Sequence, residues 1–270
     1  MFGLDDPMES FKRTYGNLND IVQNIIDILT MSPESNHAVW ASIENVFNVL
    51  LPVGYSVATI FILMTFVNQA MLFKLNNYER IVKLFLVFTI GKVILENSFD
   101  LMGWLYSETA NLMLQAGKIT PMENLVDMNE LEAHMSQMNR LDRFIFWTQS
   151  LPTTAIVSLI NTTVNVFAYG RLIELYVYMA LAPLPLSTAV SEDHRSIAKS
   201  FFQSYIGVCI QGFIMLLCCI IYTGLAIEFK DPTQNASMMG GFGGYLLASM
   251  VLLLVLAKSG NWAKEIVGLR

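Results

Sequence analysis

VLLPVGYSVATIFILMTFV, residues 49–67, gives the clearest indication of the fold, because its nineteen consecutive positions carry no charged side chain. About 20 apolar residues in a helix have the length that crosses the hydrocarbon core of a bilayer. The whole chain shares this character. Of its 270 residues, 54% are hydrophobic and 14% are charged, against about 25% charged in an ordinary soluble domain. We therefore predict an all-α, polytopic membrane helical bundle. The composition excludes a disordered chain, a coiled coil and a basic nucleic-acid-binding domain.

Four further apolar stretches follow the first one, which extends over residues 41–73 and has Pro52 near its start. They cover residues 81–106, 148–187, 202–227 and 240–257. The length of the chain allows five or six crossings of about 20 residues each. We expect about five transmembrane helices, with six as the alternative.

The stretch 148–187 is too long for one simple span and contains only two charged residues, Arg171 and Glu174. One interpretation is two helices that turn at residues 169–171. The other is one crossing with a bent or re-entrant continuation that ends at Ala182-Pro183-Leu184-Pro185, because proline stops a helix. Irregular backbone at membrane depth would have to be shielded by protein or water.

Two regions outside the spans also have a helical pattern. Residues 17–30 place isoleucines and leucines at helical spacing, which predicts a short N-terminal amphipathic helix. Residues 107–143 are polar but contain recurring Met, Leu and Val, which indicates a small helical subdomain rather than a linker.

The distribution of basic residues favours five crossings with the N-terminus outside and the C-terminus in the cytoplasm. With that arrangement the inside segments 71–83, 188–200 and 258–270 hold eight Lys and Arg, and the much longer outside segments hold six. The density of basic residues is then about threefold higher inside, as the positive-inside rule requires. Six crossings would move two of the three basic segments outside.

The expected organisation follows from this topology. It comprises an external segment with the amphipathic helix at 1–40, two transmembrane helices in 41–106, an external helical loop at 107–143, a C-terminal transmembrane bundle at 144–258 with a cytoplasmic loop at 188–200, and a cytoplasmic tail at 259–270.

Several polar or small residues lie within the apolar stretches. Lys92, Glu96 and Asp100 follow each other at i, i+4 and i+8, so that on one helix they share a face; they form either a structural ion pair or the lining of a conduit or subunit face. A second polar group, Asn161, Asn165 and Gln211, indicates either interhelical hydrogen bonds or a hydrated lining. Three small residues spaced by four positions, Gly240, Gly244 and Ala248, favour close helix packing.

The sequence contains no pattern that is typical of catalysis. Its three histidines, His37, His134 and His194, lie far apart and have no partner at a metal-ligand spacing. The HExxH, GxSxG and phosphate-binding-loop motifs are absent. We therefore expect a protein that is not an enzyme and that holds no metal or cofactor.

The segment GRLIELYVYMALAPLPLSTAVSEDHRSIAKSFFQSYIGVCIQGFIM, residues 170–215, resembles the core of TrbL-like conjugal-transfer proteins, the polytopic inner-membrane subunits of type IV secretion systems. The features that carry the resemblance are the Gly-Arg helix start, the Ala-Pro-x-Pro ending at 182–185, the short polar loop and a following helix with Gln211-Gly212-Phe213.

The resemblance implies a scaffold or channel subunit in the bacterial cell membrane that helps to move single-stranded DNA with attached protein. The partners that it implies are other secretion membrane subunits, separate ATPases, membrane lipids and further copies of the chain, and a transient contact with single-stranded DNA stays open. By the same analogy Arg171 and Glu174 are expected to form an interfacial pair, and Pro183 and Pro185 to shape the internal loop.

Two other functions compete with this one. A small-solute transporter or ion channel would often show inverted repeats with paired broken helices, and only residues 148–187 look broken here. A membrane-complex assembly factor without a conduit is the third alternative, and the sequence does not separate it from the first.

Overall fold

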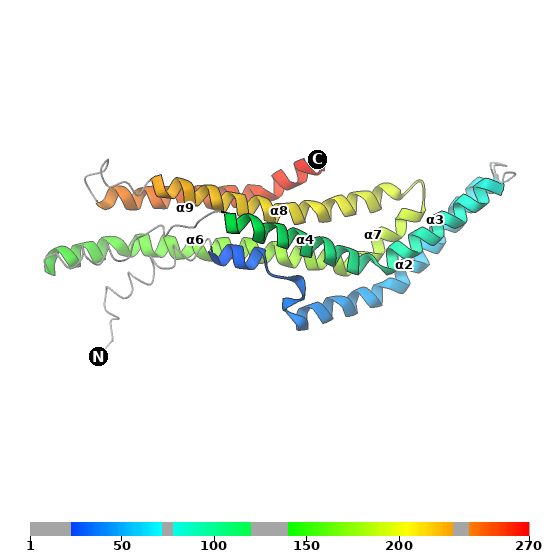
Figure 1. Cartoon of the computed structure of the whole chain (residues 1–270), viewed down its shortest axis with the longest axis horizontal. Helices are drawn as coiled ribbons and strands as arrows, with labels where there is room; N and C mark the ends of the chain where they lie inside the picture. The colour runs from blue at the N-terminus through cyan, green and yellow to red at the C-terminus, as the bar shows by residue number, and fades with distance from the viewer. Residues whose placement is uncertain (1–22, 72–77, 120–139, 229–237, 270) are drawn as a thin grey trace. The chain divides into compact units, whose positions relative to one another are not determined.

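The computed structural model describes residues 23–71, 78–119, 140–228 and 238–269, and within these ranges the chain forms helices and no β-strand. In chain order the elements are the 3-10 helix η1 (Pro33–Ser35), α2 (His37–Met71), α3 (Tyr78–Glu96), α4 (Ser98–Ile119), α6 (Arg140–Leu181), α7 (Pro183–Leu186), the 3-10 helix η3 (Ser187–Val190), α8 (Arg195–Glu228) and α9 (Met238–Ile266) (Figure 1). The all-α prediction is confirmed for this part of the chain.

The chain divides into two compact units. The first comprises residues 1–30, 112–170 and 212–260, and the second comprises residues 31–111, 171–211 and 261–270. Because α4, α6, α8 and α9 each supply residues to both units, the units are not consecutive domains of the sequence.

The second apolar stretch does not form the single helix that we predicted over residues 81–106. Helix α3 ends at Glu96 and α4 begins at Ser98, with Asn97 between them. The Asn97 Nδ2 atom donates to the carbonyl of Val93 (2.8 Å), and the Ser98 hydroxyl donates to the carbonyl of Leu95 (2.9 Å). Short polar side chains that bond to nearby carbonyls compete with regular helix, which accounts for the interruption.

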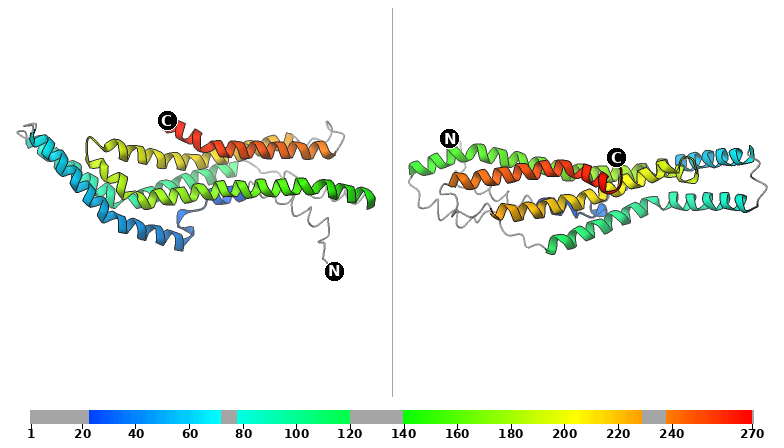
Figure 2. Two further views of the ribbon diagram at one scale, coloured as in Figure 1. Left: turned by 180° about the vertical axis from the view of Figure 1, so that it is seen from behind. Right: turned by 90° about the horizontal axis from the view of Figure 1, so that it is seen from above.

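The long stretch 148–187 forms one helix with a bent continuation, which is the second of the two interpretations. Helix α6 continues through residues 169–171 without a turn (Figure 2). It ends at Leu181, and the α7–η3 segment departs from it at an angle of 46°. Pro183 and Pro185 have no N–H group to continue the helical ladder, so the bend lies where the sequence placed it.

Several element boundaries differ from the expected organisation. Helix α4 continues past residue 107 to Ile119, so the start of the expected external loop is helical. Helix α8 begins at Arg195, inside the expected loop 188–200, and α9 extends past residue 257 to Ile266. Polar residues do not by themselves stop a helix, so these helices continue beyond the ends of the apolar stretches. The remainder of the expected external loop, residues 120–139, lies outside the described residues.

The first unit contains the N-terminal amphipathic helix, described here over residues 23–29. Its apolar face is buried, and the predicted amphipathic pattern is confirmed for these residues. The buried residues are Ile25, Ile26, Ile28 and Leu29, whereas Gln23, Asn24 and Asp27 are exposed. In the same unit α8 and α9 are joined by a hydrogen bond between the hydroxyls of Tyr222 and Ser249 (3.0 Å).

The second unit has a large apolar core to which α2, α3, α4, α6 and α8 all contribute. Its fully buried members include Leu95, Met102, Tyr106, Leu175, Met179 and Tyr205. Helix α2 packs against α3, α7 and η3. A Cβ atom placed on Gly54 would lie 2.8 Å from the carbonyl oxygen of Pro183, so a glycine at this position allows α2 and α7 to touch.

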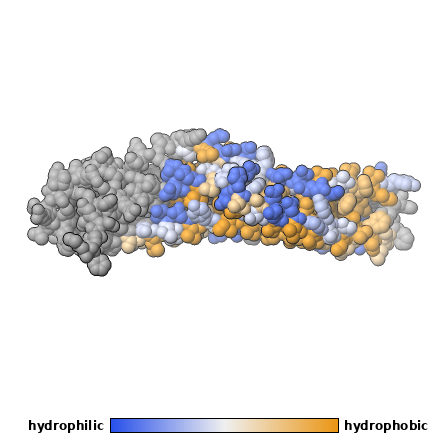
Figure 3. Space-filling view, turned by 90° about the horizontal axis from the view of Figure 1, so that it is seen from below, coloured by the Kyte–Doolittle hydropathy of each residue, from blue (hydrophilic) through white to orange (hydrophobic). Residues whose placement is uncertain are grey.

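Two helices of the described part are long and apolar enough to cross a membrane, His37–Met71 and Arg195–Tyr222. The bent pair formed by Asn161–Leu181 and Pro183–Val190 would make a third. The hairpin of α2 and α3 exposes many apolar side chains, among them Ile60, Leu63, Phe66, Val82, Phe85 and Leu86. Figure 3 shows this apolar surface in orange at the right of the view. An exposed apolar surface of this kind is typical of contact with lipid or with another protein.

Candidate functional site

Arg171 on α6 is buried inside the second unit, with only 3% of its surface exposed. Its Nε atom donates to the carbonyl of Val208 (3.0 Å), and its Nη2 atom donates to the carbonyl of Cys209 (3.3 Å). The guanidinium carbon lies 6.0 Å from the centre of the Tyr106 ring, at the limit of a cation–π contact. One side chain of α6 therefore connects two consecutive carbonyls in the middle of α8 and an aromatic ring of α4.

The expected pair between Arg171 and Glu174 does not form. The ion pairs within the described residues are Lys83–Glu192 and Lys92–Glu96, and Glu174 lies exposed on α6. The planar guanidinium fork fits two neighbouring carbonyls, whereas the carboxylate three positions along the same helix stays on the exposed side. The expected pair is corrected to a bond between helices. The carboxylate of Glu174 is exposed on the surface of α6 and forms no ion pair within the described residues.

Three tyrosines tie the same region together, and sequence reasoning did not single them out. The hydroxyl of Tyr106 donates to the carbonyl of Met31 (3.0 Å), that of Tyr176 to Pro33 (3.0 Å), and that of Tyr205 to Met102 (2.6 Å). A buried tyrosine needs a partner for its hydroxyl, so tyrosine inside an apolar stretch was the signal that could have found them.

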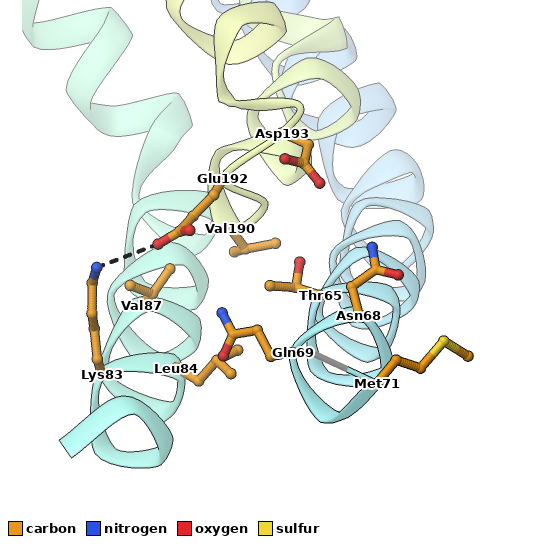
Figure 4. Close-up of a pocket in the computed structure, with 10 residues that line it drawn as sticks. All are labelled: Thr65, Asn68, Gln69, Met71, Lys83, Leu84, Val87, Val190, Glu192 and Asp193. Carbon is orange, nitrogen blue, oxygen red and sulfur yellow. Dashed lines mark hydrogen bonds and ion pairs between the residues drawn. The ribbon is translucent and has the colours of Figure 1, made fainter. Parts of the chain in front are cut away.

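A cavity of about 680 Å³ lies between α2, α3 and the turn that leads into α8 (Figure 4). Its lining comprises Thr65, Asn68, Gln69 and Met71 of α2, Lys83, Leu84 and Val87 of α3, and Val190, Glu192 and Asp193 of the turn region. Lys83 Nζ and Glu192 Oε1 are 3.3 Å apart and close one side. Sequence reasoning did not indicate this cavity, because the turn that supplies Glu192 and Asp193 lies about 100 residues beyond the α2 and α3 segments.

Lys92 and Glu96 form an ion pair with 3.6 Å between Nζ and Oε1, and about half of each side chain is exposed. Together with Tyr55, Thr59 and other residues of α2 and α3 they line a second cavity of about 330 Å³. Asp100 belongs to α4, on the other side of the break at Asn97, so the predicted continuous stripe is interrupted. Charges on an exposed helix face are costly in hydrocarbon, which favours water or another protein next to this pair.

Asn161 and Asn165 lie one turn apart on α6 in the first unit. Asn165 Nδ2 donates to Asn161 Oδ1 (3.2 Å), and the buried Oδ1 atom of Asn165 has no hydrogen-bond partner among the described residues. Gln211 belongs to the second unit, so the structure does not join it to the two asparagines in one compact unit. Gly240, Gly244 and Ala248 lie in α9, and their packing is outside what the structure describes.

The described residues contain no group of three His, Cys, Asp or Glu side chains that could hold a metal ion. His194 stacks on Phe61, with 4.7 Å between ring centres, and its Nδ1 atom lies 3.1 Å from the hydroxyl of Ser191. The arrangement fixes the turn before α8 and gives it a structural role.

A family model described as TrbL/VirB6 plasmid conjugal transfer-like protein matches residues 18–183, which is more than half of the chain. The match covers the N-terminal amphipathic helix, both helices of the α2–α3 hairpin and α6 up to the proline bend. Neither a curated protein nor a solved structure matches the chain.

Proposed function

The chain belongs to the TrbL/VirB6 plasmid conjugal transfer-like family, and on that premise we propose that it is an integral-membrane subunit of a conjugative type IV secretion system. In this role it helps to build the passage through which single-stranded DNA with attached protein leaves the cell. The family match over residues 18–183 is the observation that carries this proposal.

The distribution of apolar surface supports a membrane location. In the most apolar part of α2 only 11% of the residues are buried within the chain, against 56% in α8. A helix that is apolar on nearly all sides and exposed needs lipid or a neighbouring subunit around it. We assign α2 to the lipid or subunit boundary of the bundle and α8 to its interior.

We propose five crossings in the bacterial cytoplasmic membrane, with the N-terminal amphipathic helix outside and the C-terminus in the cytoplasm. Two contacts support placing the basic segments on one side. The Lys83–Glu192 ion pair joins segment 71–83 to segment 188–200. Gln203 on α8 donates to the carbonyl of Val267 in the tail (3.4 Å), close to the start of α8.

The chain acts as a scaffold and shares the conduit with partners, without catalysing a reaction. A translocated polyanion would favour a hydrated basic or polar lining. Within the described spans such residues are few, and the half-exposed Lys92–Glu96 pair is one charged feature that a partner or a second copy could meet. The energy for transport comes from separate ATPases of the system.

The proposal is tested by deleting the gene in frame in a strain that carries the conjugative element. We expect the transfer frequency to fall to background and to return when the wild-type chain is supplied from a plasmid. Unchanged transfer in the deletion strain would contradict the proposal and favour a small-solute transporter, for which solute uptake is the next assay.

A second experiment distinguishes a scaffold subunit from a subunit that lines the conduit. Donor cells are cross-linked during transfer, the tagged chain is precipitated, and the transferred strand is amplified from the precipitate. Recovery of that strand with a known ATPase of the system but not with this chain is the result expected for a scaffold. Equal recovery with both would place the chain at the conduit wall.

A further inference from the structure

The cavity of about 680 Å³ between α2, α3 and the turn before α8 is lined by two carboxylates, Glu192 and Asp193, and by one ammonium group, that of Lys83. The Oε1 atom of Gln69 is buried and has no partner among the described residues. The carboxylate of Asp193 forms no ion pair within the described residues, and that of Glu192 bonds to Lys83 through one oxygen. Both carboxylates are exposed, so a ligand that donates charge-assisted hydrogen bonds can reach them.

The walls of the cavity are apolar. Leu84 and Val87 line it from α3, and Val190 lines it from η3 (Figure 4). In the same view Glu192 turns toward Lys83, whereas Asp193 lies on the side of Thr65 and Asn68. A ligand with an aliphatic stem and a cationic, donor-rich end therefore matches both the walls and the carboxylates.

The single cation of the lining is weakly held. Lys83 and Glu192 are 70% and 56% exposed, and exposed ion pairs contribute only about 0–1 kcal/mol. An incoming cation can compete with Lys83 for Glu192 or can pair with Asp193, which forms no ion pair within the described residues. With one Lys, one Glu and one Asp, the lining has an excess of one negative charge.

We infer that this cavity receives an arginine or lysine side chain from a neighbouring polypeptide of the secretion assembly. A phospholipid amine is a poorer match, because its phosphate would lie beside two carboxylates. The inference rests on the proposed function for the identity of the neighbour, but its test uses the purified chain and does not depend on conjugation.

The test measures thiol modification at Thr65→Cys in the full chain, purified in nanodiscs of phosphatidylcholine. The native cysteines Cys209, Cys218 and Cys219 are buried, and the chain without the new cysteine gives their background. The rate with a trimethylammonium-ethyl methanethiosulfonate is divided by the rate with the sulfonatoethyl reagent, and the quotient is normalised to that of free mercaptoethanol. We expect a normalised ratio of about ten, equivalent to about 1.4 kcal/mol.

Two variants shift this ratio in opposite directions. Asp193→Asn removes an attracting charge and lowers the ratio, and Lys83→Gln removes the competing cation and raises it. A purely structural role of the two residues would not produce opposite shifts. A ratio near one in the parent, or shifts of the same sign, would overturn the inference.

Protection by a peptide identifies the ligand. Acetyl-Gly-Arg-Gly-amide should slow modification at Thr65→Cys, and the matched peptide with neutral citrulline should not. Protection should be lost with Asp193→Asn. Equal protection by both peptides would overturn the inference, as would protection by phosphatidylethanolamine in the nanodisc without any peptide, which would assign the cavity to lipid.

Discussion

The guanidinium of Arg171 has no carboxylate partner in the described part of the chain, and it is satisfied by carbonyls of α8. An unneutralised buried charge costs desolvation free energy, which two hydrogen bonds and a nearby aromatic face only partly offset. Arg171 therefore fixes which faces of α6, α4 and α8 meet, more than it adds to stability.

The shape of the guanidinium and its charge can be separated by two variants of Arg171. Arg171→Lys keeps the charge but loses the planar fork, so we expect it to lower the free energy of unfolding by about 1–3 kcal/mol. Arg171→Met removes the charge as well and should cost less. Thermal unfolding in detergent measures both, and a Met variant less stable than the Lys variant would contradict this account.

Glu174 provides the matching test at an exposed site. Because its side chain lies at the surface and does not pair with Arg171, we expect Glu174→Gln to change the free energy of unfolding by less than about 0.5 kcal/mol. A loss as large as that of Arg171→Lys, measured in the same way, would restore the pair inferred from the sequence.

At the scale of single elements, short local motifs decide where helices stop. Asn97 and Ser98 interrupt the second apolar stretch through hydrogen bonds to carbonyls one turn back. Pro183 and Pro185 end the long α6 and turn the chain by 46° into α7 and η3. Helix α2 then packs on this bent segment.

The close approach of α2 and α7 depends on Gly54. In Gly54→Ala the new methyl group would lie 2.8 Å from the backbone oxygen of Pro183, and backbone yields less easily than a flexible side chain. We expect a loss of about 1–3 kcal/mol in the free energy of unfolding, as for other overpacked sites.

Gly170→Ala is the control for this prediction. A Cβ atom at Gly170 would meet no atom within 4 Å in the described part of the chain. Since alanine is the better helix former, this variant should gain up to about 1 kcal/mol. Equal losses at both positions would show that α7 does not depend on close contact with α2.

At the scale of the whole molecule, the proposed topology determines which surfaces meet the cytoplasm. The Lys83–Glu192 contact joins two segments that are rich in basic residues, and Gln203, just beyond the second of them, bonds to Val267 in the third. The cavity of about 680 Å³ is lined by Lys83 of segment 71–83 and by Glu192 and Asp193 of segment 188–200, so in this topology its ligand would come from the cytoplasmic side.

Accessible tags test this topology. With five crossings a protease added to intact spheroplasts should remove a tag fused before Met1 and should leave a tag fused after Arg270 intact. Lysed spheroplasts, in which both tags must be cleaved, are the control. Cleavage of the C-terminal tag in intact spheroplasts would favour six crossings.

The family and the helical class followed from the sequence, and the structure and the family match confirm them. The bend at Pro183 was one of two interpretations of residues 148–187. It could be predicted from the sequence because proline disrupts a helix locally. The break at Asn97 was missed, although its cause is also local, because apolar residues continue on both sides of it.

The length of the apolar stretches, the position of the helix-stopping prolines and the asymmetry of basic charge can therefore be read directly from the amino-acid sequence. The partners of Arg171, and the cavity that brings Gln69, Lys83 and Asp193 together, depend instead on how the helices pack. The reason is physical: hydropathy and proline act within one turn of their own position. The partner of a buried donor, by contrast, is set by which helix faces pack together, and it can lie far along the chain, as for Tyr205 with Met102 and Tyr176 with Pro33.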